Sequence, residues 1–200
     1  MPTRPQVRRA TPADRDRVVD LVTLAFEHDP LWSRALARPG GGTDHHRRYW
    51  GLLVDGAMRH GATWLAADGA AVAVWVPPGE TELTGPQERE VVEVLTEELG
   101  PGADDCLTLL GRFETSHPRH EPHYYLSLLG THPDHRGRGI GMALLAHNLA
   151  LVDLEGSPAY LESSNPANDA RYRGAGFEPV GSFAFPGGGP VVTTMWRPAR

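Results

Sequence analysis

The sequence contains no lysine, and all nineteen of its basic residues are arginine. This absence excludes a phosphate-binding P-loop, a pyridoxal Schiff base and any other site that depends on a lysine amine. The single cysteine, Cys106, excludes an internal disulfide and a four-cysteine zinc site. It is expected on a packing face of a helix, away from every motif, so no acyl intermediate on its sulfur is expected.

Long apolar runs are missing as well. Nowhere do about eighteen apolar residues follow one another, and residues 1–16 lack the apolar core of a secretion signal. We therefore expect a cytoplasmic protein with no membrane partner. The net charge of −6 disfavours nucleic acid as a partner, because binding to a phosphate backbone requires a basic surface. No linker divides residues 1–200, so a single domain is expected.

The spacing of apolar residues predicts alternating helices and strands. Strands are expected at residues 6–10, 63–67, 70–76, 124–129, 159–163, 177–185 and 190–196. Helices are expected from a Thr11 cap to about Glu27, for a turn or two within 31–38, and at 44–59, 87–99, 104–114, 140–152 and 168–174. Asp68-Gly69 is typical of a tight hairpin turn. Only the strand-helix-strand unit at 124–163 must be parallel, which predicts a mixed α+β sheet.

The segment His123–Val152 organises the rest of the chain, since it begins as a strand and ends as a helix. The turn between them has three glycines at alternate positions and two flanking arginines: Gly137, Gly139, Gly141, Arg136 and Arg138. Backbone N–H groups at the start of a helix are unpaired and carry the positive end of the helix dipole. Such a turn can therefore hold a phosphate group.

Three kinds of phosphate site compete for this turn. A dinucleotide-binding fold would use Gly137, Gly139 and an acid in the next strand, Glu162. However, Met142 occupies the position of the third glycine, and residues 131–136 separate the strand from the first glycine. A P-loop fails for lack of lysine. The third possibility is the pattern Arg-x-x-Gly-x-Gly after a strand and a His-Pro turn, at residues 136–141.

This third pattern resembles the acyl-CoA-binding motif of the GNAT superfamily of N-acyltransferases. A second block at a matching distance supports the resemblance: residues 160–165 (YLESSN), then Tyr172, then Gly176-Phe177. The segments WLAADGAAVAVWVPP, EPHYYLSLLGTHPDHRGRGIG, PAYLESSNPANDARYRGAGF and GGGPVVTTMWRP further resemble the puromycin N-acetyltransferase-like branch. The resemblance implies a GNAT-type α+β fold with a mixed, mostly antiparallel sheet, a central splayed parallel strand pair and helices on both faces.

The resemblance also implies acetyl-CoA as co-substrate and no metal. The pantetheine arm would pair with the strand edge freed by the splay, and the pyrophosphate would lie on the glycine turn. By position, the donor-binding residues would be Leu129, Gly130, Thr131, Arg136, Gly137, Arg138, Gly139, Ile140, Gly141, Met142 and Asn165. The two arginines could equally be solvated surface residues, and Asn165 could close an Asx turn.

Two residues are candidates for the acid and the base. Transfer of an acyl group from a thioester to an amine releases a thiolate, which leaves more readily when a hydroxyl gives it a proton. By family position Tyr172 would be this acid; alternatively, it packs beneath Gly176-Phe177. Glu162 is the candidate base, acting through water on the attacking amine; alternatively, it holds an arginine. Direct attack in a ternary complex is the expected mechanism.

Three histidines, His117, His120 and His123, are spaced three residues apart and suggest a zinc site. The prolines between them predict an extended segment instead of a helix, so no metal is expected there. His123 could instead serve as the base. Trp32, Trp50 and Trp75 are expected in the core, although aromatic residues near the first-helix loop and the hairpin could floor an acceptor pocket.

The sequence thus predicts an N-acetyltransferase that transfers an acetyl group from acetyl-CoA to a primary amine of a small molecule, such as an aminonucleoside. One alternative is a CoA-binding or sensing protein with weak catalysis, because Tyr160 stands where related N-terminal acetyltransferases often carry glutamate. Acetylation of protein N-termini or side chains is another, and a nicotinamide-dependent oxidoreductase is a third. The acceptor, and the choice between monomer and homodimer, stay open.

Overall fold

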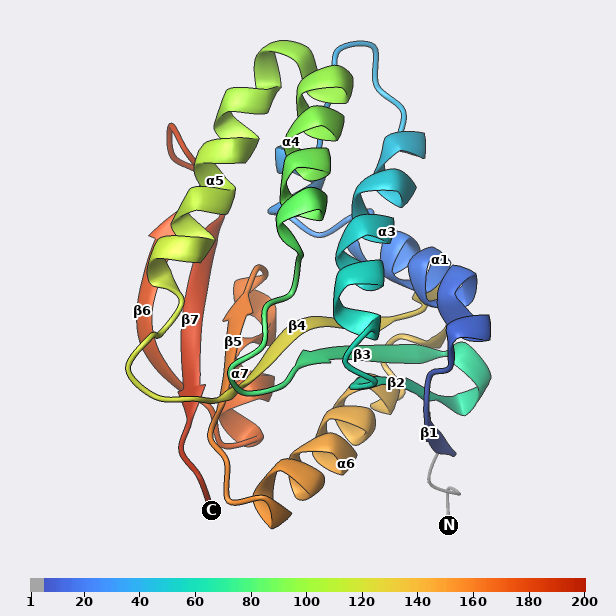
Figure 1. Cartoon of the computed structure of the whole chain (residues 1–200), viewed down its shortest axis with the longest axis vertical. Coiled ribbons are helices and arrows are strands. Elements are labelled where there is room, and N and C mark those ends of the chain that lie inside the picture. Colours follow the sequence, from blue (N-terminus) through green and yellow to red (C-terminus); the bar gives the residue numbers. More distant parts are fainter. Residues whose placement is uncertain (1–5) are drawn as a thin grey trace.

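The computed structural model describes residues 6–200, apart from the side chain of Asp68, and these residues form one seven-stranded sheet with helices on both faces (Figure 1). The strands are β1 (Val7–Arg9), β2 (Thr63–Ala66), β3 (Ala71–Val76), β4 (Tyr124–Thr131), β5 (Ala159–Ser163), β6 (Glu178–Ala184) and β7 (Val191–Arg197). Their order in the sheet is β1-β2-β3-β4-β5-β7-β6. Residues 1–5, the first part of the segment in which no secretion signal is expected, lie outside the described residues.

Helices cover both faces of this sheet. They are α1 (Arg15–Phe26), α2 (Trp32–Ala35), α3 (Asp44–Met58), α4 (Gly85–Leu99), α5 (Ala103–Ser116), α6 (Ile140–Leu154) and α7 (Asp169–Gly174). Helix α6 lies against one face, and α1, α3, α4 and α5 lie on the other side (Figure 1). Among the described residues, no helix combines the length and the apolar composition that a bilayer span requires.

Strand β3 supplies both cores, because successive side chains of a strand point to opposite faces. Val72, Val74 and Val76 pack with α1 and α3 in one cluster. Ala73 and Trp75 pack with α6 in the other. Since β3 is buried on both faces, it reads as a continuous apolar run instead of an alternating one.

Strands β4 and β5 form the single parallel pair in the described part of the chain, and they separate after three residues. The last paired residues are Leu126 of β4 and Leu161 of β5. Strand β4 continues to Thr131 beside β3, whereas β5 continues to Ser163 beside β7. The expected splayed pair is therefore confirmed, and residues 127–131 have no strand partner on the β5 side.

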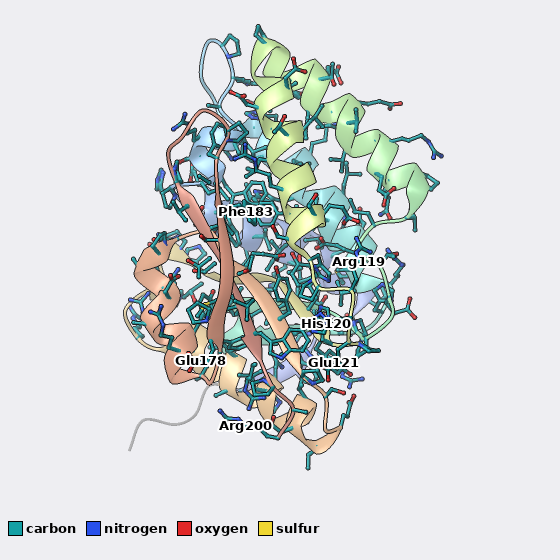
Figure 2. All side chains as sticks on the ribbon, turned by 90° about the vertical axis from the view of Figure 1, so that its left-hand side faces the viewer. Arg119, His120, Glu121, Glu178, Phe183 and Arg200 are labelled. Atoms are coloured by element: carbon teal, nitrogen blue, oxygen red, sulfur yellow. The ribbon has the colours of Figure 1, made fainter. Side chains whose placement is uncertain are left out.

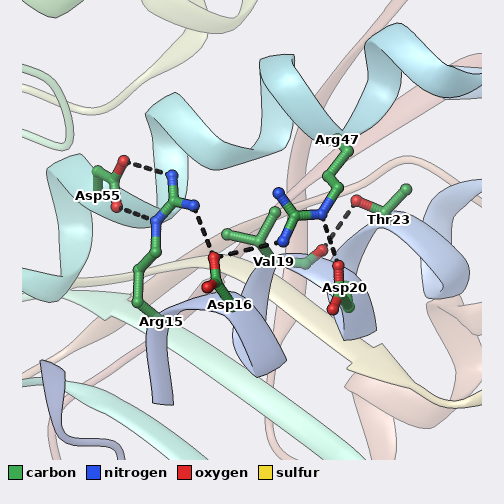
Figure 3. Close-up of polar contacts among 7 residues, drawn as sticks. All are labelled: Arg15, Asp16, Val19, Asp20, Thr23, Arg47 and Asp55. Carbon is green, nitrogen blue, oxygen red and sulfur yellow. Dashed lines mark hydrogen bonds and ion pairs between the residues drawn. The ribbon is translucent and has the colours of Figure 1, made fainter. Parts of the chain in front are cut away.

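Ion pairs join α1 to α3 on the outer surface (Figure 3). Arg15 donates from Nε and Nη2 to the two carboxylate oxygens of Asp55, at 2.8 and 2.7 Å. Arg47 donates to Asp20 at 2.7 Å and to Asp16 at 3.3 Å. Exposed pairs of this kind contribute little individually to stability. They connect two helices whose inner faces help to line the site described below.

The hairpin of β2 and β3 is confirmed, but the expectation of a two-residue turn at Asp68-Gly69 is wrong. Ala66 pairs with Ala71, so four residues connect the strands. Ala67 and Gly69 both take left-handed φ angles, of 47° and 96°. The wider turn packs onto α1, since a Cβ on Gly69 would lie 3.1 Å from Cδ of Arg17.

The start of α4 and the end of β4 also differ from the expected boundaries, each for a physical reason. Helix α4 begins at Gly85 instead of Gln87 because Thr84 caps it: its Oγ1 accepts from Gln87 N at 3.4 Å, and Gln87 Oε1 accepts from Thr84 N at 3.0 Å. Strand β4 extends to Thr131 instead of ending at Leu129, since its last residues still pair with β3.

Candidate active site

A cavity of about 620 Å³ lies where β4 and β5 separate. Its lining includes the two predicted acid–base residues, Tyr172 and Glu162. It also includes every residue predicted to bind the donor except Arg138, which is exposed on the outer side of the turn. Positions far apart in the sequence therefore share one enclosed space.

The glycines of the turn are needed for two different reasons. Gly137 and Gly139 have left-handed φ angles of 76° and 73°, which only glycine adopts at low cost, and there is open space around them. Gly141 is helical, but a Cβ there would lie 2.5 Å from Oγ1 of Thr131. The first turn of α6 therefore approaches the end of β4 as closely as backbone allows.

Unpaired amides face the cavity at the start of α6. The first helical hydrogen bond runs from Ala143 N to Gly139 O, at 2.9 Å, so the amides of residues 140–142 precede the hydrogen-bonded turns of the helix. Arg136 lies beside them and donates from Nη2 to the backbone oxygen of Ala25 at 2.8 Å. Its guanidinium thus ties the turn to the end of α1 and leaves its charge at the cavity, where an anion can bind.

Residues Leu129–Thr131 form the edge of β4 that lacks a strand partner on the β5 side. Gly130 is required there by packing, because a Cβ would lie 2.8 Å from the Cβ of Ala25 and 3.4 Å from Cγ1 of Val72. Helix α1 therefore presses directly on this edge, and the backbone groups of the edge face the cavity where an extended ligand can pair with them.

Asn165 does close an Asx turn, since its Oδ1 accepts a hydrogen bond from Ala167 N at 3.1 Å. Its side chain lines the cavity at the same time. The neighbouring Ser164 donates from Oγ to Oδ2 of Asp29 at 2.9 Å, and Asp29 Oδ1 accepts from the backbone N of Leu31 at 3.0 Å. The exit of β5 is thereby fixed to the segment between α1 and α2.

Tyr172, on α7, both packs and faces the cavity. Its ring lies 6.3 Å from that of Phe177 at an angle of 76°, as in the packing alternative. Burial, followed by the negative charges of Asp29 and Asp169, raises the pKa of Tyr172 to about 12. The hydroxyl therefore stays protonated at neutral pH and remains available as a donor.

Glu162 lies on β5 with only 2 % of its side chain exposed. Nδ1 of His117 lies 3.8 Å from its Oε1, and in the described part of the chain no arginine pairs with it. Burial and then the charges of Glu162 and Glu82 raise the pKa of Tyr125 well above its usual value. The phenol of Tyr125 thus lies near the carboxylates of Glu162 and Glu82 in the cavity wall.

The three histidines do not gather around a common point. Nε2 of His117 lies 3.2 Å from Nε2 of His123, whose Nδ1 donates to the backbone oxygen of Glu121 at 2.8 Å. The ring of His120, which Figure 2 labels, lies 5.6 Å from that of Trp196, and the ring of His123 lies 5.1 Å from the same Trp196 ring. Within residues 6–200, no group of three or more His, Cys, Asp or Glu side chains is placed to hold a metal ion.

Glu82, in the loop between β3 and α4, is a cavity residue that sequence reasoning missed. Its Oε1 accepts a hydrogen bond from Oγ of Ser127, the extra residue of a β-bulge opposite Val74 and Trp75. Burial chiefly raises the pKa of Glu82 from 4.5 to about 7, and the charge of Glu162 adds to this shift. One sequence signal existed: Gly56, isolated inside a helical pattern, marks a close backbone approach.

Aromatic side chains form the rest of the cavity wall, away from the glycine turn. Trp32 stacks on Phe113 at 5.7 Å with an interplanar angle of 15°. Phe26, Tyr49 and Tyr125 also line the cavity. Trp32 is buried in the core cluster, as expected, and also lines the cavity, whereas the fully buried Trp50 belongs to the core alone.

A splayed parallel strand pair, a glycine turn that opens the following helix and a tyrosine at their cavity are the architecture of the GNAT acetyltransferases. In its fold and in this motif segment, the chain is similar to these enzymes. The sequence profile of the Acetyltransferase (GNAT) family matches residues 101–177, which contain β4, the turn, α6, β5 and α7.

Solved structures resemble the chain along nearly its whole length. A Corynebacterium glutamicum protein described as histone acetyltransferase HPA2 and related acetyltransferase has a TM-score of 0.71 and 26% identity, covering 99% of this chain and 98% of that one. Arylalkylamine N-acetyltransferase 2 of Aedes aegypti has a TM-score of 0.73 at 16% identity, covering 99% and 100%. The Drosophila melanogaster polyamine N-acetyltransferase has a TM-score of 0.68 at 17% identity, covering 97% and 99%.

Proposed function

We propose that the chain, as one acyltransferase domain over residues 1–200, transfers an acetyl group from acetyl-CoA to a primary amine of a small molecule. The observation that carries this proposal is the single cavity shared by the glycine turn, the edge of β4, Tyr172 and Glu162. Because no wall separates them, donor and acceptor can meet there, and the amine can attack the thioester directly.

The donor half of the cavity fits a nucleotide-bearing thioester. The amides of residues 140–142 and the guanidinium of Arg136 would hold the pyrophosphate by hydrogen bonds and charge. The edge of β4 at Leu129–Thr131 would pair with the pantetheine arm. Asn165 would contact the same arm through its amide nitrogen, since its oxygen is used by the Asx turn.

The chain supplies proton transfer at both ends of the reaction. Tyr172 would donate a proton to the leaving sulfur, which its raised pKa allows because the phenol is still protonated at neutral pH. Glu162 would accept the proton of the attacking amine through water. Direct contact of amine and thioester requires no acyl-enzyme, and the one cysteine, Cys106, is buried in the core outside the cavity lining.

A small amine is proposed as acceptor because solved structures of similar fold include enzymes named for polyamine and arylalkylamine acetylation. An aminonucleoside, as expected from the puromycin-like segments, is one member of this class. We propose a cytoplasmic location and a monomer or homodimer as the working form, without nucleic acid or membrane as partner.

The test is an acceptor screen. Purified protein is mixed with acetyl-CoA and with aromatic amines, polyamines, aminonucleosides and peptides, and free thiol is followed with a colorimetric reagent. We expect thiol release with small amines and not with peptides. Binding of acetyl-CoA in calorimetry without thiol release from any amine would favour a CoA-binding or sensing protein. Binding of NAD without binding of CoA would overturn the proposal.

A further inference from the structure

We propose that Glu82 completes the acceptor site: together with Glu162 it forms a carboxylate pair that receives the ammonium group of an aromatic amine and takes up its proton. This inference rests on the proposed function, for which it names the substrate class and a further catalytic residue. It starts from Glu82 because this is a buried, titratable cavity residue that the donor chemistry does not use.

The backbone of Glu82 is fixed from outside the cavity by the end of α3. Arg59 donates from Nη1 to the backbone oxygens of Glu82, at 2.8 Å, and Gly56, at 2.6 Å, and from Nη2 to that of Thr81. His60 adds a contact of 2.9 Å from Nε2 to the same Thr81 oxygen. These hydrogen bonds hold the backbone of the loop in place, which gives Glu82 a defined position.

The two carboxylates each keep capacity for a ligand. Oε1 of Glu82 is bonded to Ser127, and in the described residues no hydrogen bond occupies its Oε2. Oε1 of Glu162 is fully buried and has no hydrogen-bond partner there either. A buried carboxylate oxygen without a partner, such as Oε1 of Glu162, is costly, and a hydrogen-bond donor that enters the cavity would relieve this cost.

The charges around Glu82 explain why the hydrogen-bond donor of the ligand should be a cation. The groups that face Glu82 are Ser127 and Tyr125 from β4, Glu162 from β5, His117 just after α5, Tyr49 from α3 and Arg59 just after α3. The guanidinium of Arg59 is engaged with backbone oxygens, as described above. Two neighbouring carboxylates repel each other when both are ionised, and one ammonium group placed between them would offset this repulsion.

The aromatic wall indicates what the ammonium is attached to. Phe26, Trp32, Phe113 and Tyr125 line the cavity beside the carboxylates. Such rings bind an aromatic or alkyl body by area and stacking. A long polyamine would bring further ammonium groups onto this wall, where they would lose hydration without a second carboxylate pair. The acceptor is therefore an aromatic monoamine.

The proton balance of the step is as follows. The ammonium gives one proton to the carboxylate pair, and the free nitrogen attacks the thioester carbonyl to form a C–N bond. The C–S bond then breaks, Tyr172 gives its proton to the sulfur, and the nitrogen's second proton restores the Tyr172 hydroxyl. The pair releases its proton to water. One ammonium and one thioester thus give one amide, one thiol and one proton.

The test uses Glu82→Gln, Glu162→Gln and the double variant, with Glu80→Gln as matched control. Glu80 lies in the same loop but is 56 % exposed and pairs with His60 at 3.7 Å. We expect each cavity variant to lower kcat/KM for phenethylamine about 10²- to 10⁴-fold, with unchanged affinity for acetyl-CoA in calorimetry. Because the pair acts as a unit, the double variant should be less than about tenfold worse than the poorer single variant.

The pH profile separates catalysis from structure. Phenethylamine is again the acceptor, since an alkylammonium group titrates near about pH 10 and its own titration therefore lies outside the acid limb. We expect the acid limb of kcat/KM, near pH 7, to be lost in Glu82→Gln and kept in Glu82→Asp. Thermal unfolding checks that each variant is folded.

The outcomes that overturn the inference are distinct from those that overturn the proposed function. Unchanged kcat, KM and pH profile in folded Glu82→Gln would remove Glu82 from the site, while the unaltered protein still acetylates amines. A preference of the unaltered protein for spermidine over phenethylamine would overturn the substrate class. If the unaltered protein acetylates no amine at all, the proposed function itself fails.

Discussion

Trp75 Nε1 donates a hydrogen bond to Asn148 Oδ1 at 3.1 Å, which links β3 to α6 inside the core. Both side chains are almost fully buried, so water cannot replace either partner. The Nδ2 group of Asn148 has no partner in the described residues. Helix α6, whose first turn forms the proposed phosphate site, is therefore attached to the sheet by a buried hydrogen bond as well as by the ion pair of Asp153 with Arg197 of β7.

Replacement of Asn148 by leucine should destabilise the protein, although leucine is apolar and of similar size. The indole N–H of Trp75 would be left buried without an acceptor, which costs about 1–3 kcal/mol. Urea unfolding measures this loss. Leu154→Ala, at a position 84 % exposed on the same helix, is the control and should change nothing. Equal stability of Asn148→Leu and the unaltered protein would show that the contact contributes no net free energy.

Alanine at Gly141 and at Gly137 should have different effects. At Gly141 the new Cβ collides with Thr131 Oγ1, so the first turn of α6 must move, and acetyl-CoA affinity should decrease by at least about tenfold, or ~1.4 kcal/mol. At Gly137 a Cβ has open space around it. Alanine there must only adopt the left-handed φ angle of this position, which costs about 1 kcal/mol of stability. Calorimetry with acetyl-CoA and thermal unfolding separate the two. The reverse order of affinities would contradict the close approach.

Tyr172→Phe should lower kcat roughly ten- to a thousandfold, the range of a general acid. The ring that packs on Phe177 is retained, so neither stability nor acetyl-CoA affinity should change by more than about twofold. Tyr124→Phe is the matched control, since the Tyr124 hydroxyl donates to Glu155 at 2.7 Å on the surface. Unchanged turnover in Tyr172→Phe would remove this hydroxyl from the chemistry.

Glu82 should make stability depend on pH in an unusual direction. Its pKa is raised on folding from 4.5 to about 7, so the unfolded chain releases this proton first as pH increases. Stability should then decrease by up to about 3 kcal/mol between pH 4.5 and pH 7 and stay low above pH 7. Glu82→Gln removes this dependence and should unfold at higher temperature than the unaltered protein at pH 8. Parallel pH curves for the two proteins would refute the buried, ionisable state.

The elements were predictable from sequence where one physical pattern dominates. Apolar spacing located α3 and α6, and the need for a parallel connection around α6 fixed the centre of the sheet. The turn at Asp68-Gly69 was not predictable in the same way. Its local signal favours a two-residue turn, but packing of the turn on α1 imposes a four-residue one.

The candidate site also has one part that local sequence predicts and one part that depends on tertiary packing. Its donor half lies on a continuous motif, because a glycine turn before a helix has the same consequences in any fold, and the structure places those residues around one cavity. Glu82 belongs to no motif. Its position depends on the hydrogen bonds from Arg59 to the loop backbone and on the hydrogen bond from Ser127, which lies in a β-bulge. Each of these contacts joins residues more than twenty positions apart in the sequence.

The short pairing of β4 with β5 has a consequence for the lifetime of the protein. Three residue pairs are the strand contacts that join β1–β4 to the other three strands in the described chain. An acetyl-CoA molecule bound between the separated strand ends would add a second bridge between these two parts of the sheet, and its binding energy would add to the stability of the folded state. Hydrogen exchange in β5 and cleavage by proteases should therefore slow as acetyl-CoA is added, so the lifetime of the protein would increase with the supply of its proposed co-substrate.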